Sequence, residues 1–148
     1  SDLGNLAKSD IDKGSLVPDE VTIGMLEAEV NAHPQATGFI FDGFPRTSAQ
    51  AEALDVFLAS KGTEISAMLA LEVEDEELIS RLLERGKSSG RADDQNREVI
   101  KNRIEVYERE TAILKDYYAA QNKYIGVSGV GSISSITENL CKEIDALI

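Results

Sequence analysis

Hydrophobic residues in this chain occur either in short uninterrupted runs or in longer stretches where they recur every three or four positions. Three runs have the length of a strand and lie at 39–41, 67–71 and 124–127. Because they show no polar alternation, they are typical of strands buried on both faces of a parallel sheet. The stretches with helical spacing cover residues 1–13, 18–30, 47–62, 75–85, 95–121 and 132–148.

Strands that alternate with helices predict an α/β fold with parallel pairing and right-handed crossovers. A length of 148 residues suits a single domain with one core. The sequence contains neither an apolar run of membrane-span length nor a basic-then-apolar leader, so we expect a cytoplasmic protein that does not enter membranes. The net charge of −12 argues against a nucleic acid as partner, because most of the surface would repel a polyanion.

Cysteine usage excludes one class of site and predicts a packing role. Cys141 is the only cysteine, which rules out an intrachain disulfide and a cysteine-based zinc site. Since it lies among Ile136, Leu140 and Ile144, we expect a small residue that packs in the last helix rather than a nucleophile.

Arginines concentrate in the middle of the chain and offer a local site for an anion in an acidic protein. A solvated helix face is the alternative explanation for such a cluster. Its members are Arg81, Arg85, Arg91, Arg97, Arg103 and Arg109.

The stretch from 38 to 50 has the layout of a ligand site. Asp42 follows a predicted strand, and ligands in open α/β sheets bind beyond the carboxyl ends of strands. Gly43 permits a close backbone approach, and Pro45 fixes a turn whose peptide bond can be cis. Arg46 suits a phosphate, while Gln50, one helical turn later, offers the donor and acceptor that reading a nucleobase requires. The alternative is a solvated Asp followed by a surface Arg-Gln pair.

A second candidate segment is the glycine-bounded stretch 86–90, followed by Asp93 and Asp94. Two glycines around a short polar segment can serve as the hinges of a lid. A plain surface turn is the alternative.

These motifs resemble those of a known family. Asp42-Gly43-Phe44-Pro45-Arg46-Thr47, with Gln50 following, is similar to the monophosphate-binding signature of the adenylate kinases, and the similarity extends from 14–18 through 85–94 to 129–132. The resemblance implies a three-layer parallel sheet with flanking helices, of the P-loop nucleoside monophosphate kinase type. It also implies one kinase core over 1–148, in which 1–17 contributes to the monophosphate-binding region and 85–95 forms a short lid.

Adenylate kinases transfer the γ-phosphoryl group of MgATP to AMP and give two ADP, and the resemblance assigns residues to both substrates. Arg81 would stack on the ATP adenine, Arg85 would bind the ATP phosphates, and the backbone of Gly131 would accept from the adenine amino group. Arg91 and Arg103 would bracket the transferred phosphoryl group. The expected AMP contacts are Ser15, Leu16, Val17, Gly43, Phe44, Pro45, Arg46, Gln50, Arg91 and Arg103.

The remaining implied roles concern the metal and the lid. Asp42 resembles the carboxylate that holds Mg²⁺ through water, so the expected catalytic set is Asp42, Arg85, Arg91 and Arg103. Asp93 and Asp94 match a lid pair, and the short lid implies no zinc. Arg91 and Arg103 stand one residue further apart than in the family pattern, which leaves Lys101 as the alternative to Arg103.

The chain departs from the family pattern at its beginning. Family members start with a strand, a glycine-rich phosphate-binding loop ending in Lys and a second strand, whereas here the early Lys8 and Lys13 lie outside any glycine loop. We therefore expect a family member that lacks its first several dozen residues; the full-length chain is expected to be a monomer, and a chain starting at Ser1 is expected to be inactive. The alternatives are a UMP/CMP kinase, in which Asn usually replaces Gln50, and a non-catalytic AMP-binding fragment.

Overall fold

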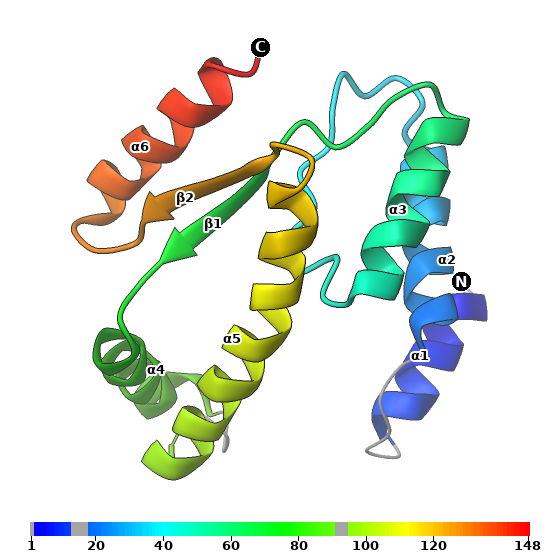
Figure 1. The fold of residues 1–148 in the computed structure, drawn as a ribbon. Helices are drawn as coiled ribbons and strands as arrows, with labels where there is room; N and C mark the ends of the chain where they lie inside the picture. The colour runs from blue at the N-terminus through cyan, green and yellow to red at the C-terminus, as the bar shows by residue number, and fades with distance from the viewer. Residues whose placement is uncertain (1, 13–17, 91–94) are drawn as a thin grey trace. The chain divides into compact units, whose positions relative to one another are not determined.

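The computed structural model describes residues 2–12, 18–90 and 95–148, which form two compact units, Ser1–Glu64 and Ile65–Ile148 (Figure 1). We call them the N-terminal unit and the C-terminal unit. Their elements follow the predicted alternation of helices with strands only in the second unit. No helix within the described ranges combines the length and the apolar character that crossing a bilayer requires.

The N-terminal unit is helical. It contains α1 (Asp2–Asp12), α2 (Asp19–Ala32) and α3 (Ser48–Ser60), and α2 packs against both of the others. The approach of α1 to α2 is close at Gly24, where an added Cβ would lie 3.1 Å from Leu3 Cδ1. Among the described residues of this unit, the buried apolar side chains are Ala7, Val21, Val30, Ala51, Leu54 and Leu58.

Both ends of α3 confirm the sequence prediction. Thr47 Oγ1 caps the helix by accepting from the backbone N–H of Gln50 at 3.1 Å. At the other end Lys61 is the C-cap, and Gly62 follows with a φ of +74°, which a glycine adopts without strain.

The predicted strand at 39–41 is wrong. These residues form no strand, and Ile40 is 88% exposed. A β-strand exists only when its backbone groups bond to a neighbouring strand, and none of the described strands pairs with this segment. The rings of Phe39 and Phe41 instead stack on each other, 6.1 Å apart.

The C-terminal unit has the predicted parallel pairing. Its strands β1 (Met68–Glu72) and β2 (Tyr124–Ser128) pair in parallel, with Met68 opposite Tyr124 and Glu72 opposite Ser128. The unit also contains α4 (Asp75–Ser89), α5 (Arg97–Ala119) and α6 (Ile133–Asp145). Both α5 and α6 contact β2, and Figure 1 shows them on opposite sides of the strand pair. The α/β class is therefore confirmed, with a two-stranded sheet in the described residues where three strands were expected.

Helices α4 and α5 share an apolar core. Ile79, Ile100 and Ile104 are buried together, and Leu78, Leu82 and Leu83 pack against them. Ile100 is completely buried. This core buries one face of α4, and Arg81 stands on an exposed face of the same helix.

Helix α4 is longer than its sequence suggests. The predicted loop at 86–90 is helical through Ser89, and Gly90 alone leaves the helix, in the left-handed conformation typical of a C-cap. Gly86 is buried inside the helix, and an interior glycine costs only about 1 kcal/mol, which packing can offset. Lys87 Nζ also bonds Glu84 Oε2 at 2.8 Å in this turn.

Helix α6 confirms one prediction and corrects another. It spans Ile133–Asp145 within the predicted stretch 132–148, and Ser132 caps it, because its Oγ accepts from the N–H of Ser135 at 3.1 Å. Cys141, however, is exposed, so the expected packing role is wrong. Successive side chains of a helix point about 100° apart. Leu140 is half-buried, and the next residue, Cys141, therefore points into solvent.

Candidate functional site

The Gly43–Gln50 segment folds into a closed turn in the N-terminal unit. The Phe44–Pro45 bond is cis, and Gly43 has a φ of +74°. Arg46 Nε donates to the carbonyl of Gly43 at 2.8 Å, and an added Cβ on this glycine would lie 3.2 Å from Arg46 Nη2. The positive φ favours glycine at this position, and a side chain there would also displace the guanidinium slightly.

Arg46 is exposed and belongs to an acidic unit. Residues 1–64 contain eleven acidic and four basic residues. The Arg46 guanidinium is therefore one of the few positive charges in this unit that can attract an anion. In the described part of the chain, the Arg46 guanidinium donates to the carbonyl of Gly43 through Nε. Its terminal nitrogens keep the planar fork that suits a phosphate.

Gln50, by contrast, is buried, and both polar atoms of its side chain make a hydrogen bond within the unit. Its side chain is 8% exposed, its Oε1 accepts from the backbone N–H of Arg46 at 2.8 Å, and its Nε2 donates to Asp19 Oδ1 at 2.8 Å. The sequence alone did not identify Asp19 as a site residue. No local signal could have found it, because 31 positions separate the two partners.

The other predicted monophosphate contacts have simpler surroundings. Asp42 is exposed next to Gly43, and Phe44 and Pro45 are half-buried in the turn. Ser15, Leu16 and Val17 lie outside the described residues, as do Arg91, Asp93 and Asp94.

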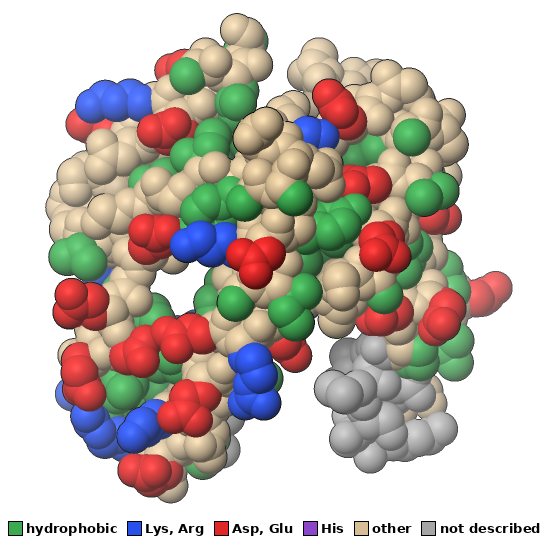
Figure 2. Space-filling model, in the orientation of Figure 1, with side chains coloured by type: hydrophobic (Ala, Val, Ile, Leu, Met, Phe, Trp, Pro, Cys, Tyr) green, Lys and Arg blue, Asp and Glu red, His purple; other side chains and the backbone are tan. Residues whose placement is uncertain are grey.

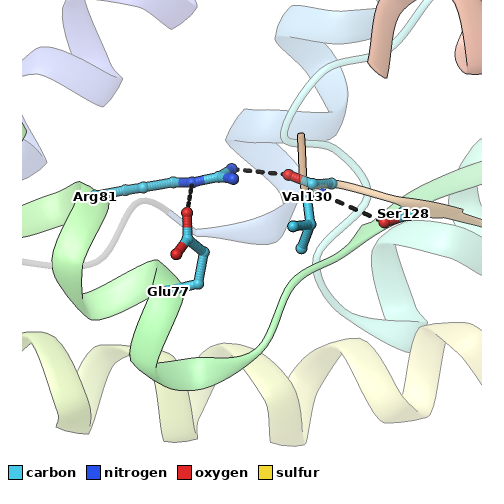
Figure 3. A network of polar contacts seen from close by, with 5 residues as sticks. Glu77, Arg81, Ser128 and Val130 are labelled. Carbon is cyan, nitrogen blue, oxygen red and sulfur yellow. Dashed lines mark hydrogen bonds and ion pairs between the residues drawn. The ribbon is translucent and has the colours of Figure 1, made fainter. Parts of the chain in front are cut away.

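A second group of predicted site residues meets in the C-terminal unit. Arg81 on α4 donates through Nη1 to the carbonyl of Gly129 at 2.9 Å, across 48 positions of sequence. Glu77, one turn earlier, accepts from Arg81 Nε at 2.9 Å and orients the guanidinium (Figure 3). The turn after β2 is held in place by Ser128, whose Oγ accepts from the N–H of Val130 at 3.3 Å. Arg81 thus lies beside the segment that leads to Gly131.

This arrangement stands at the carboxyl ends of both strands. A shallow hollow of about 420 Å³ is lined there by Glu72, Val73, Glu74, Ser128 and Val130. Gly131 has a φ of +125° and belongs to neither a helix nor a strand. Ligands of open α/β sheets bind at this edge, and Arg81 and Gly131 therefore lie where a ligand can bind.

The remaining arginines stand on the same helices. Arg85 follows Arg81 by one turn on α4, and Arg103 is half-buried on α5. Each interacts with other groups of the chain. On the face drawn in Figure 2, most of the Lys and Arg side chains belong to the C-terminal unit.

A larger hollow lies away from these contacts. It measures about 590 Å³ and is lined by Ser80, Leu83, Glu84, Gly86, Lys87 and Gln95. Among the described residues, no predicted nucleotide contact lines either hollow, and Gly86 and Lys87 of the larger one belong to the segment expected to form the lid. Of the two, only the smaller hollow is lined by the neighbours of Gly129, to whose carbonyl Arg81 donates.

No cluster of three or more His, Cys, Asp or Glu side chains that could hold a metal ion occurs within the described ranges. A Mg²⁺ ion bound with a nucleotide does not need one, because phosphate oxygens and waters supply most of its ligands. The exposed carboxylate of Asp42 offers the hard oxygen donor that Mg²⁺ prefers.

Comparison with known proteins places these observations in one family. The family model described as adenylate kinase matches residues 1–123. The adenylate kinase of Flavobacterium psychrophilum is 55% identical over 147 residues, which cover 99% of this chain and 77% of the relative. The adenylate kinases of Flavobacterium johnsoniae and Bacteroides fragilis are 53% and 48% identical over the same shares. The match to the family model and the identity to these relatives show that the chain belongs to the adenylate kinase family.

Proposed function

We propose that the protein transfers the γ-phosphoryl group of MgATP to AMP and forms two molecules of ADP. The observation that carries this proposal is the close similarity to adenylate kinases over 99% of the chain, together with the intact signature from Asp42 to Gln50. Phosphoryl transfer depends on positioning and on neutralising charge. The chain supplies fixed arginines for both tasks.

AMP is proposed to bind at the Gly43–Gln50 turn. The Arg46 guanidinium would bind its phosphate, and Gln50 with the turn backbone would read the adenine. Support comes from the bond of Arg46 Nε to the carbonyl of Gly43, which limits the freedom of the guanidinium before a ligand arrives. By resemblance, Ser15, Leu16 and Val17 complete this contact through their backbone.

ATP is proposed to bind beside Arg81 and Gly131. The pairing of Arg81 with Glu77 and with the carbonyl of Gly129 holds the guanidinium plane where an adenine ring can stack on it. Arg85 and Arg103 would bind the phosphates and the transferred group, with Arg91 beside them, and Asp93 and Asp94 would orient the short lid over residues 85–95.

Asp42 is the residue proposed to hold Mg²⁺, through water. When bound, the ion neutralises phosphate charge and orients the transferred group. A cytoplasmic location and a monomeric state stay predictions from the sequence.

The test is an assay of ADP formation from ATP and AMP, run beside calorimetric titration with AMP. Arg46→Ala should weaken AMP binding by about tenfold to a hundredfold, because a charge-assisted contact to phosphate is lost. Lys61→Ala is the matched control, since it removes another exposed cation of the same unit, one that lies over the ring of Phe57. It should leave AMP binding unchanged.

Substrate choice and catalysis are decided in the same experiment. Equal or better turnover with UMP or CMP would reject the assignment of AMP. AMP binding without any ADP formation would indicate the non-catalytic alternative.

A further inference from the structure

We propose that Asp19 is a positioning residue of the monophosphate site, which acts by fixing the orientation of the Gln50 carboxamide and thereby the turn that carries Arg46. This inference rests on the proposed role of that turn in binding AMP. It concerns a residue that the signature sequence does not include.

The bond between Asp19 and Gln50 is a tertiary contact in a sheltered place. Gln50 is 8% exposed, and its Nε2 lies 2.8 Å from Asp19 Oδ1. The bond joins the first turn of α2 to the first turn of α3, two helices that pack against each other. A hydrogen bond to a charged group in such a place is stronger than one between neutral groups.

Both neighbours of Gln50 require the same orientation of its amide. The backbone N–H of Arg46 can only donate, and it donates to Gln50 Oε1 at 2.8 Å. The carboxylate of Asp19 can only accept when ionised. A flipped amide would place donor against donor at Arg46 and acceptor against acceptor at Asp19. A single orientation is therefore fixed, and it leaves one amide N–H and one oxygen lone pair for a ligand.

Loss of the Asp19 carboxylate would leave a buried amide donor without its partner, which is unfavourable. Gln50 would then rotate, and the N–H of Arg46 would lose its acceptor too. The turn that holds the guanidinium would no longer be fixed in place before AMP binds, so AMP affinity should fall.

A simple charge effect has the opposite sign. Removing a negative charge from this acidic unit reduces the repulsion of an anionic nucleotide, so electrostatics alone predicts tighter AMP binding. The direction of the change therefore separates positioning from charge.

The experiment is a calorimetric titration with AMP of the wild type and of Asp19→Ala, Asp19→Asn and Glu20→Ala. We expect Asp19→Ala to weaken binding about tenfold, and Asp19→Asn to retain most of the affinity because Asn Oδ1 can still accept. Glu20→Ala is the matched control, since it removes the same charge from the same helical turn. It should leave binding unchanged or slightly tighter. In turnover, Asp19→Ala should raise the KM for AMP and leave the KM for ATP unchanged.

A double-mutant cycle shows whether Asp19 acts through Gln50. In a Gln50→Ala background, Asp19→Ala should cause no further loss of AMP affinity. A loss that persists there, or wild-type affinity in Asp19→Ala, would overturn the inference while leaving the AMP site intact. A wild type that does not bind AMP would instead reject the proposed function.

A measurement on the wild type guards against a variant that fails to fold. The side-chain amide protons of Gln50 should exchange with solvent more slowly than those of the exposed Gln35. Equal exchange rates would show that the bond to Asp19 does not hold the amide, and would overturn the inference without any substitution.

Discussion

Glu72, at the carboxyl end of β1, has a side chain that is 57% exposed and still bonds to a residue of β2. Its Oε1 accepts from the Tyr124 hydroxyl at 2.6 Å and lies 3.9 Å from Lys115 Nζ. Lys115 Nζ also stands 4.7 Å from the centroid of the Tyr124 ring. Gly126 leaves the room for this arrangement, because an added Cβ would lie 2.5 Å from the same carboxylate oxygen. Three ionisable side chains are therefore coupled on one face of the sheet.

The phenol of Tyr124 should report this coupling. Burial, followed by the bond to Glu72 and the charge of that carboxylate, raises the pKa of Tyr124 to about 12. Because the pKa in the folded state lies above the ordinary value of 10.0, the stability from the neutral phenol is complete below pH 10 and is lost as the pH rises through 12. Glu72→Gln should lower this pKa only part of the way, since burial remains. Ultraviolet titration of the tyrosinate measures it.

The control for that titration is Glu74→Gln, a change of a nearby exposed carboxylate that does not bond Tyr124. Tyr124→Phe should remove the high-pH step and so assign it. An unchanged titration in Glu72→Gln would mean that burial alone raises the pKa.

At the scale of elements, α4 and α5 are joined by packing and also by a carboxyl pair. Asp75 stands in the first turn of α4, where the helix N-terminus favours negative charge. A hydrogen bond to Asp75, followed by partial burial and the charges of Asp75 and Glu105, raises the pKa of Glu108 above 4.5. The contact is therefore most favourable when Glu108 carries a proton.

The sign of the resulting pH dependence can be tested with Glu108→Gln. A raised pKa in the folded state means that this pair stabilises the fold below pH 4.5 and loses that contribution as the pH rises through the raised value. At pH 7 the substitution should stabilise the protein by a few tenths of a kcal/mol, the size expected for a solvent-screened surface pair. The gain should shrink at pH 4.

Thermal unfolding at the two pH values measures this effect. Glu110→Gln, on the same helix, is the matched control because Glu110 does not contribute to the shift. A gain of the same size in both variants would point to the net charge of −12 rather than to the contact with Asp75.

At the scale of the whole molecule, each compact unit has apolar side chains that are withdrawn from water. Leu54 is 1% exposed in the N-terminal unit, and Ile100 is 0% exposed in the C-terminal unit. Truncating either one should cost about 2–5 kcal/mol, because buried contacts are lost and a cavity remains. If the units are separate folding units, each substitution acts locally.

Hydrogen exchange should show this locality. Leu54→Ala is expected to speed amide exchange in α2 and α3, and Ile100→Ala in α4 and α5. Val56→Ala is the control, since Val56 is 73% exposed on α3. Exchange that rises equally in both units after either substitution would show one cooperative structure.

Much of the candidate site could be predicted because its chemistry is local. The cap at Thr47, the positive φ at Gly43 and the closeness of Arg46 to Gln50 all follow from residues within one or two turns. The role of Asp19 did not follow, since its partner lies 31 positions away. The helix through 86–89 was also missed, because packing of Gly86 overrides its low helical propensity.

The sequence by itself determined the spacing of most helices, the caps of α3 and α6, the parallel strand pair and the turn chemistry of the Gly43–Gln50 motif. These depend on backbone preferences and on periodic burial, which act within a few residues. Tertiary structure decided which distant groups meet, as Asp19 meets Gln50 and Arg81 meets the carbonyl of Gly129. It also decided that residues 39–41 are not a strand. The physical reason is that a strand, like a buried polar group, needs a bonding partner that only another part of a folded protein can supply.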